Sequence, residues 1–339
     1  MLVLGIESSC DETAAALVAN GCTVYSNVVA SQIRTHRPFG GVVPELASRE
    51  HLRNIGYVVR RAFDEAGKEY ADIDGIAVTQ GPGLIGSLLV GLSFAKAMAF
   101  ALGKPLVPVN HLEGHIYSVF IQHPEVPHPV LALIVSGGHT SLVYSSAEGN
   151  YQAVARTRDD AAGEALDKIA KFLGLGYPGG PVIDRLSREG DAGAFAFSRP
   201  KMSDGSLDFS FSGFKTAALR YIQSTGIRPV KKGGRPSRRT LDLVASYQNA
   251  IVEALVAQTR KAVEQLHPRS ILLVGGVACN SLLRSRFRER FSDSAEVFYP
   301  DPVFTTDNAA MIAAAGTSKL QHQRSVPLAL NAYADLPLC

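Results

Sequence analysis

The two histidines of the run His111–His115 have the spacing that places two metal ligands on one face of a helix. Zinc proteases use a similar pair, but their glutamate directly follows the first histidine and acts as the general base. Here Glu113 is two residues further along, and at about 100° per residue it points away from the shared face. Gly114 weakens a helix by about 1 kcal/mol relative to alanine, which indicates close approach by another element. The pair therefore predicts a metal site that still needs a third ligand, and not a protease.

The third ligand is expected from a separate segment, because two imidazoles alone leave a divalent ion under-coordinated. Asp307 is the best candidate, just before the small-residue run 309–316. An acidic residue that enters a helix also has a simpler explanation, because it caps the helix and interacts favourably with its dipole. The histidines could likewise be polar residues on an exposed helix face. The residues by themselves leave metal binding and these structural roles open.

The composition is that of a globular protein with enough core for two domains, since 46% of its 339 residues are hydrophobic. The formal net charge of +3 is too small to indicate nucleic-acid binding by itself. The four cysteines show no paired spacing, which favours a reducing compartment over a disulfide framework. No signal peptide is apparent at the N-terminus. We expect a cytoplasmic protein in which the apolar stretch 84–102 is a buried helix and not a membrane span.

Two segments repeat one design, an apolar strand that runs into a turn of small residues. The first is 2–9 followed by 13–18, and the second is 131–140 followed by 141–144. Each predicts a β-hairpin whose turn exposes backbone N–H groups, as phosphate binding requires. Either copy alone is weak evidence, whereas two copies in equivalent strand contexts are harder to explain as ordinary turns.

A third glycine turn at 275–280 lies between a predicted strand, 270–274, and a predicted helix, 281–290. Its glycines allow a ligand to approach the backbone, and the helix N-terminus could bind an anion or a ribose, although a routine turn is equally consistent. The alternation of strands and helices predicts an α/β protein of two lobes. Further helical patterns occupy residues 45–65, 86–101, 163–173 and 241–266.

The stretch Lys231–Arg239 contains five Lys or Arg residues together with Gly and Pro. This composition predicts a loop. A solvated, flexible excursion is the simpler explanation, and contact with RNA phosphates is the alternative.

The three glycine turns, in this order, are similar to the two phosphate loops and the adenosine loop of the actin, hexokinase and heat-shock ATPase (ASKHA) superfamily. With the histidine pair and further motifs, nearly the whole chain resembles the TsaD family of bacterial tRNA N6-adenosine threonylcarbamoyltransferases, formerly described as O-sialoglycoprotein endopeptidases. The further motifs are Gly5–Thr13, Gly40–Arg49, Gly81–Leu84, Val135–Thr140, Asp208–Gly213 and Thr306–Met311.

This resemblance implies a two-lobed, actin-like ATPase fold with a duplicated mixed β-sheet core flanked by helices. The N-terminal lobe is expected to contain residues 1–107 and 308–339, with the first phosphate hairpin and a partner interface. The C-terminal lobe is expected to contain residues 108–307, with the metal ligands, the second phosphate loop and the adenosine loop.

The resemblance also implies roles for individual residues. His111, His115 and Asp307 together hold one divalent metal per subunit, iron(II) in the first place and zinc as the alternative. This implication favours ligation over capping for Asp307, although Asp307 could do both. An adenine nucleotide, the substrate threonylcarbamoyl-AMP, contacts Ile134, Val135, Ser136, Gly137, Gly138, Asp167, Gly180, Asp184 and Asn280.

The implied reaction transfers the threonylcarbamoyl group from threonylcarbamoyl-AMP to the N6 amine of the adenosine 3′-adjacent to the anticodon, and releases AMP. The acceptors are tRNAs that read codons starting with A. We expect the metal to polarise the threonylcarbamoyl oxygens and the 134–138 turn to bind the phosphate. Asp11 or Glu12 is expected to orient the amine or accept its proton, although acidic residues in a turn are usually turn-formers. His139 could line the site or be structural.

The acceptor, a tRNA anticodon arm, requires more positive surface than this chain offers, and the family answers by working in a complex. The implied partners are a TsaB-like paralogue bound through the N-lobe, a TsaE-like ATPase and a TsaC-like enzyme that supplies the adenylate; no membrane is involved. The helix at 86–101 could lie at the N-lobe interface or be a core helix. The loop Lys231–Arg239 is longer than is usual for the family, which puts local RNA or partner contacts in doubt.

Three other function classes share parts of this pattern. A small-molecule kinase of the same superfamily would share the nucleotide loops but has no use for the histidine pair. A metalloprotease is contradicted by the position of Glu113 and by the nucleotide loops. A nucleotide-switched scaffold without chemistry has little physical reason to keep three metal ligands. The transferase is therefore the prediction.

Overall fold

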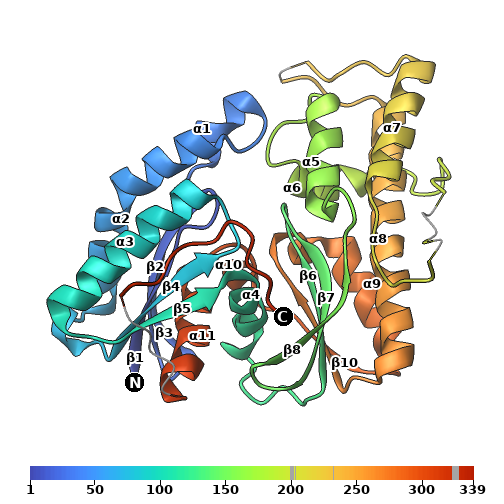
Figure 1. The fold of residues 1–339 in the computed structure, drawn as a ribbon. Helices are drawn as coiled ribbons and strands as arrows, with labels where there is room; N and C mark the ends of the chain where they lie inside the picture. Colours follow the sequence, from blue (N-terminus) through green and yellow to red (C-terminus); the bar gives the residue numbers. More distant parts are fainter. Residues whose placement is uncertain (199–201, 203, 232, 323–327) are drawn as a thin grey trace. The chain divides into compact units, whose positions relative to one another are not determined.

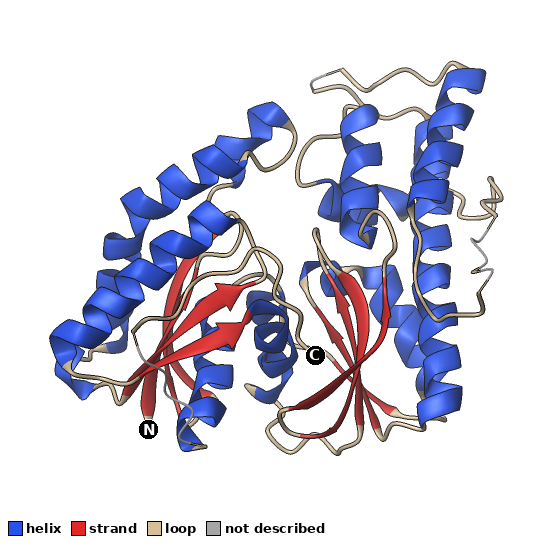
Figure 2. Ribbon diagram, viewed as in Figure 1, coloured by secondary structure: helices blue, strands red, loops and turns tan. Residues whose placement is uncertain are grey.

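The computed structural model describes residues 1–339 except 199–201, 203, 232 and 323–327 (Figure 1). The chain divides into two compact units, Met1–Val126 with Pro300–Cys339, and Pro127–Tyr299. Each unit contains one five-stranded mixed sheet with helices packed against it (Figure 2). This division differs from the expected boundaries at 107/108 and 307/308, because α4 (His111–Phe120) packs on α11 (Ala309–Gln321) within the first unit.

The first unit is built on a sheet of strand order β3-β2-β1-β4-β5. The strands β1, β2 and β3 are antiparallel neighbours, whereas β1, β4 and β5 run parallel. Their bounds are β1 Leu2–Glu7, β2 Glu12–Ala19, β3 Thr23–Ser31, β4 Gly75–Gly81 and β5 Leu106–Asn110.

The second unit repeats this topology in its sheet, whose order is β10-β9-β6-β7-β8. Here β6, β7 and β8 are antiparallel neighbours, and β6, β9 and β10 run parallel. The expected duplicated mixed sheet is therefore confirmed, and both expected hairpins, β1–β2 and β6–β7, occupy equivalent places in it. The bounds are β6 Val130–Val135, β7 Thr140–Ala147, β8 Asn150–Arg156, β9 Ser270–Val274 and β10 Glu296–Phe298.

Helices cover the two sheets. In the first unit they are α1 Ile33–His36, α2 Pro44–Ala66, α3 Ile85–Leu102, α4, α10 Pro302–Thr305 and α11. In the second unit they are α5 Ala162–Phe172, α6 Gly179–Ser187, α7 Ser212–Thr225, α8 Arg238–Leu266 and α9 Ser281–Phe291. Short 3-10 helices occupy Arg37–Phe39, Tyr70–Asp72 and Gly276–Cys279.

Strand β1 is buried on both faces, which explains the absence of polar side chains from Leu2 to Ile6. Leu4 and Ile6 join a core formed with α2 and α3, and Val3 joins a separate core formed with α4 and α11. Gly5 faces α11, where an added Cβ atom would lie 2.2 Å from the carbonyl oxygen of Ala309. The helix can therefore lie directly on the strand only because residue 5 has no side chain.

The predicted helices at 45–65, 86–101, 163–173, 241–266 and 281–290 correspond to α2, α3, α5, α8 and α9. The loop prediction for Lys231–Arg239 is wrong at its end, because Arg238 and Arg239 form the first turn of α8, which Ser237 caps. By length and composition, α3 is a helix that could cross a membrane. It packs one face into the core of the first unit and exposes Phe100 on the other, so the expected burial holds for one face only.

Candidate functional site

The histidine pair lies at the start of α4, which directly follows β5. The side chain of Asn110 caps this helix by accepting a hydrogen bond from Leu112 N at 2.9 Å. Gly114 faces α11, where an added Cβ atom would meet Ile312 at 2.7 Å, so the close approach expected at this glycine is confirmed. Glu113 forms an ion pair with Lys319 of α11 at 2.9 Å. Its carboxylate is therefore engaged by Lys319, a contact that the sequence analysis did not predict.

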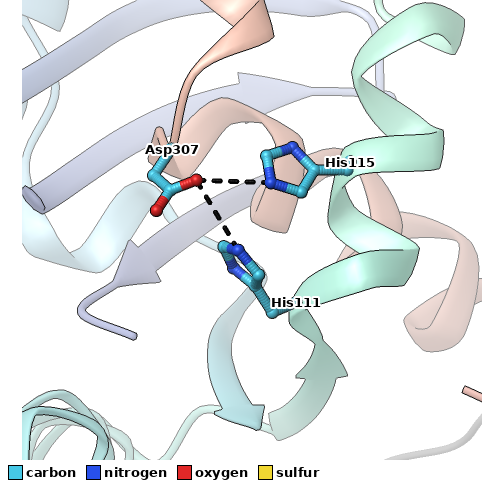
Figure 3. A group of neighbouring side chains, drawn as sticks. All are labelled: His111, His115 and Asp307. Carbon is cyan, nitrogen blue, oxygen red and sulfur yellow. Dashed lines mark ion pairs between the residues drawn. The ribbon is translucent and has the colours of Figure 1, made fainter. Parts of the chain in front are cut away.

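His111, His115 and Asp307 converge in the first unit (Figure 3). The Oδ1 atom of Asp307 lies 3.3 Å from His115 Nε2 and 3.6 Å from His111 Nε2. One ligand atom from each of the three residues lies within 4.8 Å of the others. Asp307 precedes α11, and the residue that caps this helix is Asn308, whose side chain accepts from Met311 N at 3.1 Å. The capping role considered for Asp307 thus falls to its neighbour.

Glu7, at the end of β1, is a buried carboxylate behind the histidine pair, and the sequence prediction did not identify this role. Its Oε2 atom accepts from His111 Nδ1 at 3.0 Å and from Thr79 Oγ1 at 2.7 Å, while Oε1 accepts from Ser9 N. Ser9 Oγ also lies 3.1 Å from His111 Nδ1. A carboxylate on Nδ1 fixes the imidazole so that Nε2 points to the three-residue cluster.

Charge governs the protonation of this cluster. Burial acts to lower the pKa of His111, but the carboxylates of Glu7 and Asp307 outweigh it and raise the pKa to about 9. Burial acts to raise the pKa of Glu7, but the attraction of His111 lowers it below its ordinary value. The site is therefore built to hold positive charge next to two carboxylates.

The donor set fits a divalent metal. His115 is fully buried, and neither ring nitrogen has a hydrogen-bond partner among the described residues. Burying an imidazole whose nitrogens make no hydrogen bond is costly, and a metal on Nε2 removes part of that cost. Ligands about 2.1 Å from one ion are about 3.0–3.4 Å apart at tetrahedral or octahedral angles. The measured separations of 3.3 and 3.6 Å are close to this range.

The acidic turn of the first hairpin is held by a buried histidine of α2. His51 Nδ1 lies 2.8 Å from Thr13 Oγ1, and His51 Nε2 lies 2.9 Å from the carbonyl oxygen of Cys10. Burial raises the pKa of Glu12 to about 8, although Ser31 Oγ donates to it at 2.7 Å. Burial also raises the pKa of Asp11. Glu12 is thus mainly protonated at neutral pH, and its Oε2 atom is buried without a partner among the residues described.

The turn of the second hairpin is open. Ser136 N donates to His139 O at 2.8 Å and closes the turn, and Ser136 O accepts from Gly163 N at 3.3 Å. A Cβ atom added at Gly137 or Gly138 would meet nothing within 4 Å. The start of α5, in contrast, lies against this turn, because a Cβ atom at Gly163 would be 2.5 Å from Ser136 O. The turn therefore presents exposed backbone on a fixed support, with Ile134 and Val135 buried in the strand below it.

Asp167 of α5 contacts Gly180 at the N-terminus of α6. The Oδ1 atom of Asp167 accepts from Gly179 N at 2.7 Å and from Gly180 N at 3.1 Å. The carboxylate of α5 thus fixes the first turn of α6. A Cβ atom at Gly179 would lie 2.8 Å from the Cα atom of Asp167, so the two helices are in close contact here.

Asp184 and Asn280 are connected through Gln248, a buried residue of α8 that the sequence prediction missed. Gln248 Oε1 accepts from Asn280 Nδ2 at 2.9 Å, and Asn280 Oδ1 caps α9 by accepting from Leu283 N at 3.0 Å. Asp184 Oδ1 accepts from Ser281 Oγ at 2.8 Å. These polar groups are all satisfied within one network, which holds the third glycine turn against α6. No sequence signal marks Gln248, because it is one polar residue within a long amphipathic helix.

A model of the family "TsaD: tRNA N6-adenosine threonylcarbamoyltransferase" matches residues 23–314 of the chain. The enzyme of that name from Desulfitobacterium hafniense is 50% identical over 337 residues, which cover 99% of this chain and 97% of the relative. The one from Symbiobacterium thermophilum is 53% identical over 338 residues, with the same coverage.

Solved structures of lower identity share the fold. HypF from T. kodakarensis has a TM-score of 0.62 at 15% identity, covering 95% of this chain and 48% of its own. Component A of (R)-2-hydroxyglutaryl-CoA dehydratase from Acidaminococcus fermentans has a TM-score of 0.54 at 16% identity, covering 95% and 99%. These similarities concern the fold, and they confirm the expected actin-like (ASKHA) architecture.

Proposed function

This chain belongs to the tRNA N6-adenosine threonylcarbamoyltransferase family, and on that premise we propose the reaction that it catalyses. It transfers the threonylcarbamoyl group from threonylcarbamoyl-AMP to the N6 amine of the adenosine 3′-adjacent to the anticodon, in tRNAs that read codons starting with A. AMP leaves. The proposal rests on sequence identity of 50–53% to tRNA N6-adenosine threonylcarbamoyltransferases over nearly their full length. The convergence of His111, His115 and Asp307 supports it.

His111, His115 and Asp307 would hold one divalent metal, iron(II) or zinc. Bound there, the ion would supply Lewis acidity for the acyl oxygens. The role of Glu7 is to fix the His111 ring through Nδ1 and so to present Nε2 to the ion. Asn110 and Asn308 cap the two helices that bring the ligands together, so the site is preorganised by backbone and not by flexible loops.

The second unit would bind the adenylate. The exposed residues Gly137 and Gly138 offer backbone N–H groups to its phosphate, a support that needs no side-chain movement. Around it, Asp167 with Gly180 and Asp184 with Asn280 would hold the ribose and adenine, while Ile134 and Val135 anchor the turn in the sheet. Gln248 positions Asn280 in this arrangement.

Proton transfer would fall to the acidic turn of the first unit. The attacking amine loses a proton during acyl transfer, and a base with a pKa near the working pH accepts it most efficiently. Burial brings the pKa of Glu12 to about 8, which satisfies this condition. Asp11, whose pKa is also raised, would orient the amine. His51 fixes the turn on which both carboxylates stand.

The enzyme would act in the cytoplasm within a complex. A TsaB-like paralogue would bind the first unit, because α2 and α3 expose large apolar side chains, among them Leu52, Tyr57 and Phe100. A TsaE-like ATPase would join this complex, and a TsaC-like enzyme would supply the adenylate. The proposed lobes remain those of the ASKHA fold, with the boundaries of the two compact units.

The test is a transfer assay with the full chain, its partners, threonine, bicarbonate, ATP and unmodified tRNA, read by mass spectrometry of the nucleosides. We expect threonylcarbamoyladenosine from the wild type and none from His111→Ala/His115→Ala. Product from both proteins would show that the reaction does not need the metal site, and the proposed reaction itself would stand. No product from the wild type, with partners that support a known enzyme, would refute the proposed function.

A further inference from the structure

The second unit contains a surface cavity of about 480 Å³ whose lining residues belong to none of the three glycine turns. It lies at the connection between α7 and α8 and is lined by residues from Thr225 to Thr240. Four of the lining residues are basic, namely Arg228, Lys231, Arg235 and Arg239. The described lining contains no carboxylate and no aromatic side chain.

The charges of this cavity are not neutralised within the protein. Among the described residues, none of the four basic side chains forms an ion pair or a hydrogen bond with another group. Their neighbour Arg238 is different, because it pairs with Asp242 at 2.9 Å and donates to Glu189 O at 3.0 Å. The chain as a whole carries a net charge of only +3, so this concentration is local. Clustered positive charge without carboxylates attracts anions.

The start of α8 contradicts the usual charge preference of helices. A helix N-terminus favours acidic residues, and basic ones there cost about 0.3–1 kcal/mol each. The first turn of this 29-residue helix contains Arg238 and Arg239 and no acidic residue. Arg238 is compensated by its ion pair with Asp242, whereas Arg239, which lines the cavity, has no such partner among the described residues. A local rule broken without an internal compensation is typical of a functional site. An anion in the cavity would compensate Arg239 and the helix dipole.

The loop that carries these charges is anchored on α5. Val230 N donates to Leu173 O at 2.8 Å, immediately after that helix ends. Gly174 must lack a side chain, because its φ is +69° and an added Cβ atom would lie 2.6 Å from Val230 O. The other end of α5 lies on the turn at Ser136. The 11 residues of α5 span about 16 Å, so this helix holds the anchored loop at about that distance from the turn at Ser136. Figure 1 shows α5 between α6 and α7.

We propose that this cavity binds backbone phosphates of the tRNA anticodon arm and so positions the arm for transfer, an inference that rests on the proposed function. Three of the four basic residues are arginines, whose guanidinium groups bind phosphate in a bidentate manner. The described lining offers no aromatic platform for bases, and its basic side chains match the charge of the backbone, so we expect a phosphate contact that does not depend on sequence.

The test compares two variants of the full chain with its partners present. The cavity variant is Arg228→Gln/Lys231→Gln/Arg235→Gln/Arg239→Gln. The control variant, Arg260→Gln/Lys261→Gln/Arg269→Gln/Arg290→Gln, removes the same charge from exposed positions of the second unit. Binding of unmodified tRNA is measured by fluorescence anisotropy across a salt series, with binding of AMP as the readout of the adenylate site.

Each lost phosphate contact lowers the slope of log K against log salt by about 0.7–0.9, so the cavity variant, which lacks four charges, should lose about 3 from the slope. Its affinity should fall at least about tenfold at physiological salt, equally for tRNAs of different sequence. KM for tRNA should rise with kcat preserved, and AMP binding should not change. Replacing the three arginines of the cavity with lysine keeps their charge, so this variant should retain most of the salt slope. The control should match the wild type.

Unchanged tRNA affinity and slope in the cavity variant would overturn the proposal. So would loss of inorganic phosphate binding, or loss of partner assembly, with normal tRNA binding, because these outcomes indicate a small-anion site or a protein interface. If the fourfold variant does not fold, Arg235→Glu provides the same comparison. A wild type that binds tRNA through this cavity but forms no product would refute the proposed function and leave the inference standing.

Discussion

Replacing Gly5 with alanine perturbs the metal centre without changing any of its ligands. In β1, a Cβ atom at residue 5 would lie 2.2 Å from Ala309 O and 2.7 Å from Ala313 N of α11. Ordinary contact begins at 3.4 Å, so the strand and the helix must separate by about 1 Å. Both atoms belong to the backbone, and no rotamer change can relieve the overlap.

This displacement is large on the scale of metal ligation. Asp307 lies just before α11, so movement of the helix carries its carboxylate away from the histidines on α4. Metal–ligand distances tolerate only about 0.2 Å. We therefore expect Gly5→Ala to lower metal affinity at least about tenfold. Overpacking should also lower the free energy of unfolding by about 1–3 kcal/mol.

Chelator competition measures the metal affinity, and urea denaturation of the metal-free protein measures the stability. The matched control is Gly56→Ala in α2, where an added Cβ atom would meet nothing within 4 Å. This control should raise stability by about 1 kcal/mol through helix propensity and leave metal binding unchanged. Wild-type stability and metal affinity in Gly5→Ala would refute the argument that α11 positions Asp307.

Three further changes test other parts of the site. Glu12→Gln should raise the Tm relative to wild type by an amount that grows as the pH rises from about 5 to 8. The reason is that the raised pKa of about 8 makes the native wild type retain a proton that its unfolded chain releases. Calorimetry measures the difference in Tm, and a difference independent of pH would contradict the argument. Glu7→Gln should lower metal affinity by about 10–100-fold in chelator competition well above pH 9, where most of His111 is deprotonated in both proteins. Equal affinity there would exclude the orienting role of Glu7. Gln248→Leu should weaken AMP binding about tenfold in calorimetric titration by releasing Asn280, with metal affinity as the unchanged control; wild-type AMP affinity would show that the network is not needed.

Sequence reasoning identified the parts of the site that are local in the chain. The spacing of His111 and His115 was sufficient to predict a shared helix face, and Gly114 was sufficient to predict a close neighbour. The strand and glycine patterns likewise predicted both hairpins and α9. Each of these signals depends on residues a few positions apart, where backbone geometry fixes the relation.

Contacts between distant segments could not be predicted in this way. Glu7 meets His111 across 104 positions, and Gln248 meets Asn280 across 32, so neither pairing leaves a periodic pattern. The two compact units divide the chain differently from the expected boundaries at 107/108 and 307/308. They place α4 beside α11, a packing that joins residues about 200 positions apart.

The two copies of the duplicated sheet differ at equivalent turns, and this difference explains their different proposed roles. In the first copy, the N–H group of Ser9 is taken by Glu7, and the carbonyl of Ser9 accepts from Leu84 N at 2.7 Å. A Cβ atom at Gly83 would lie 2.6 Å from that carbonyl, so the turn is closely covered. In the second copy, the Gly137–Gly138 turn is open to solvent. The first turn therefore uses its backbone groups within the protein, next to His111. The exposed backbone N–H groups that a phosphate needs are found in the second turn.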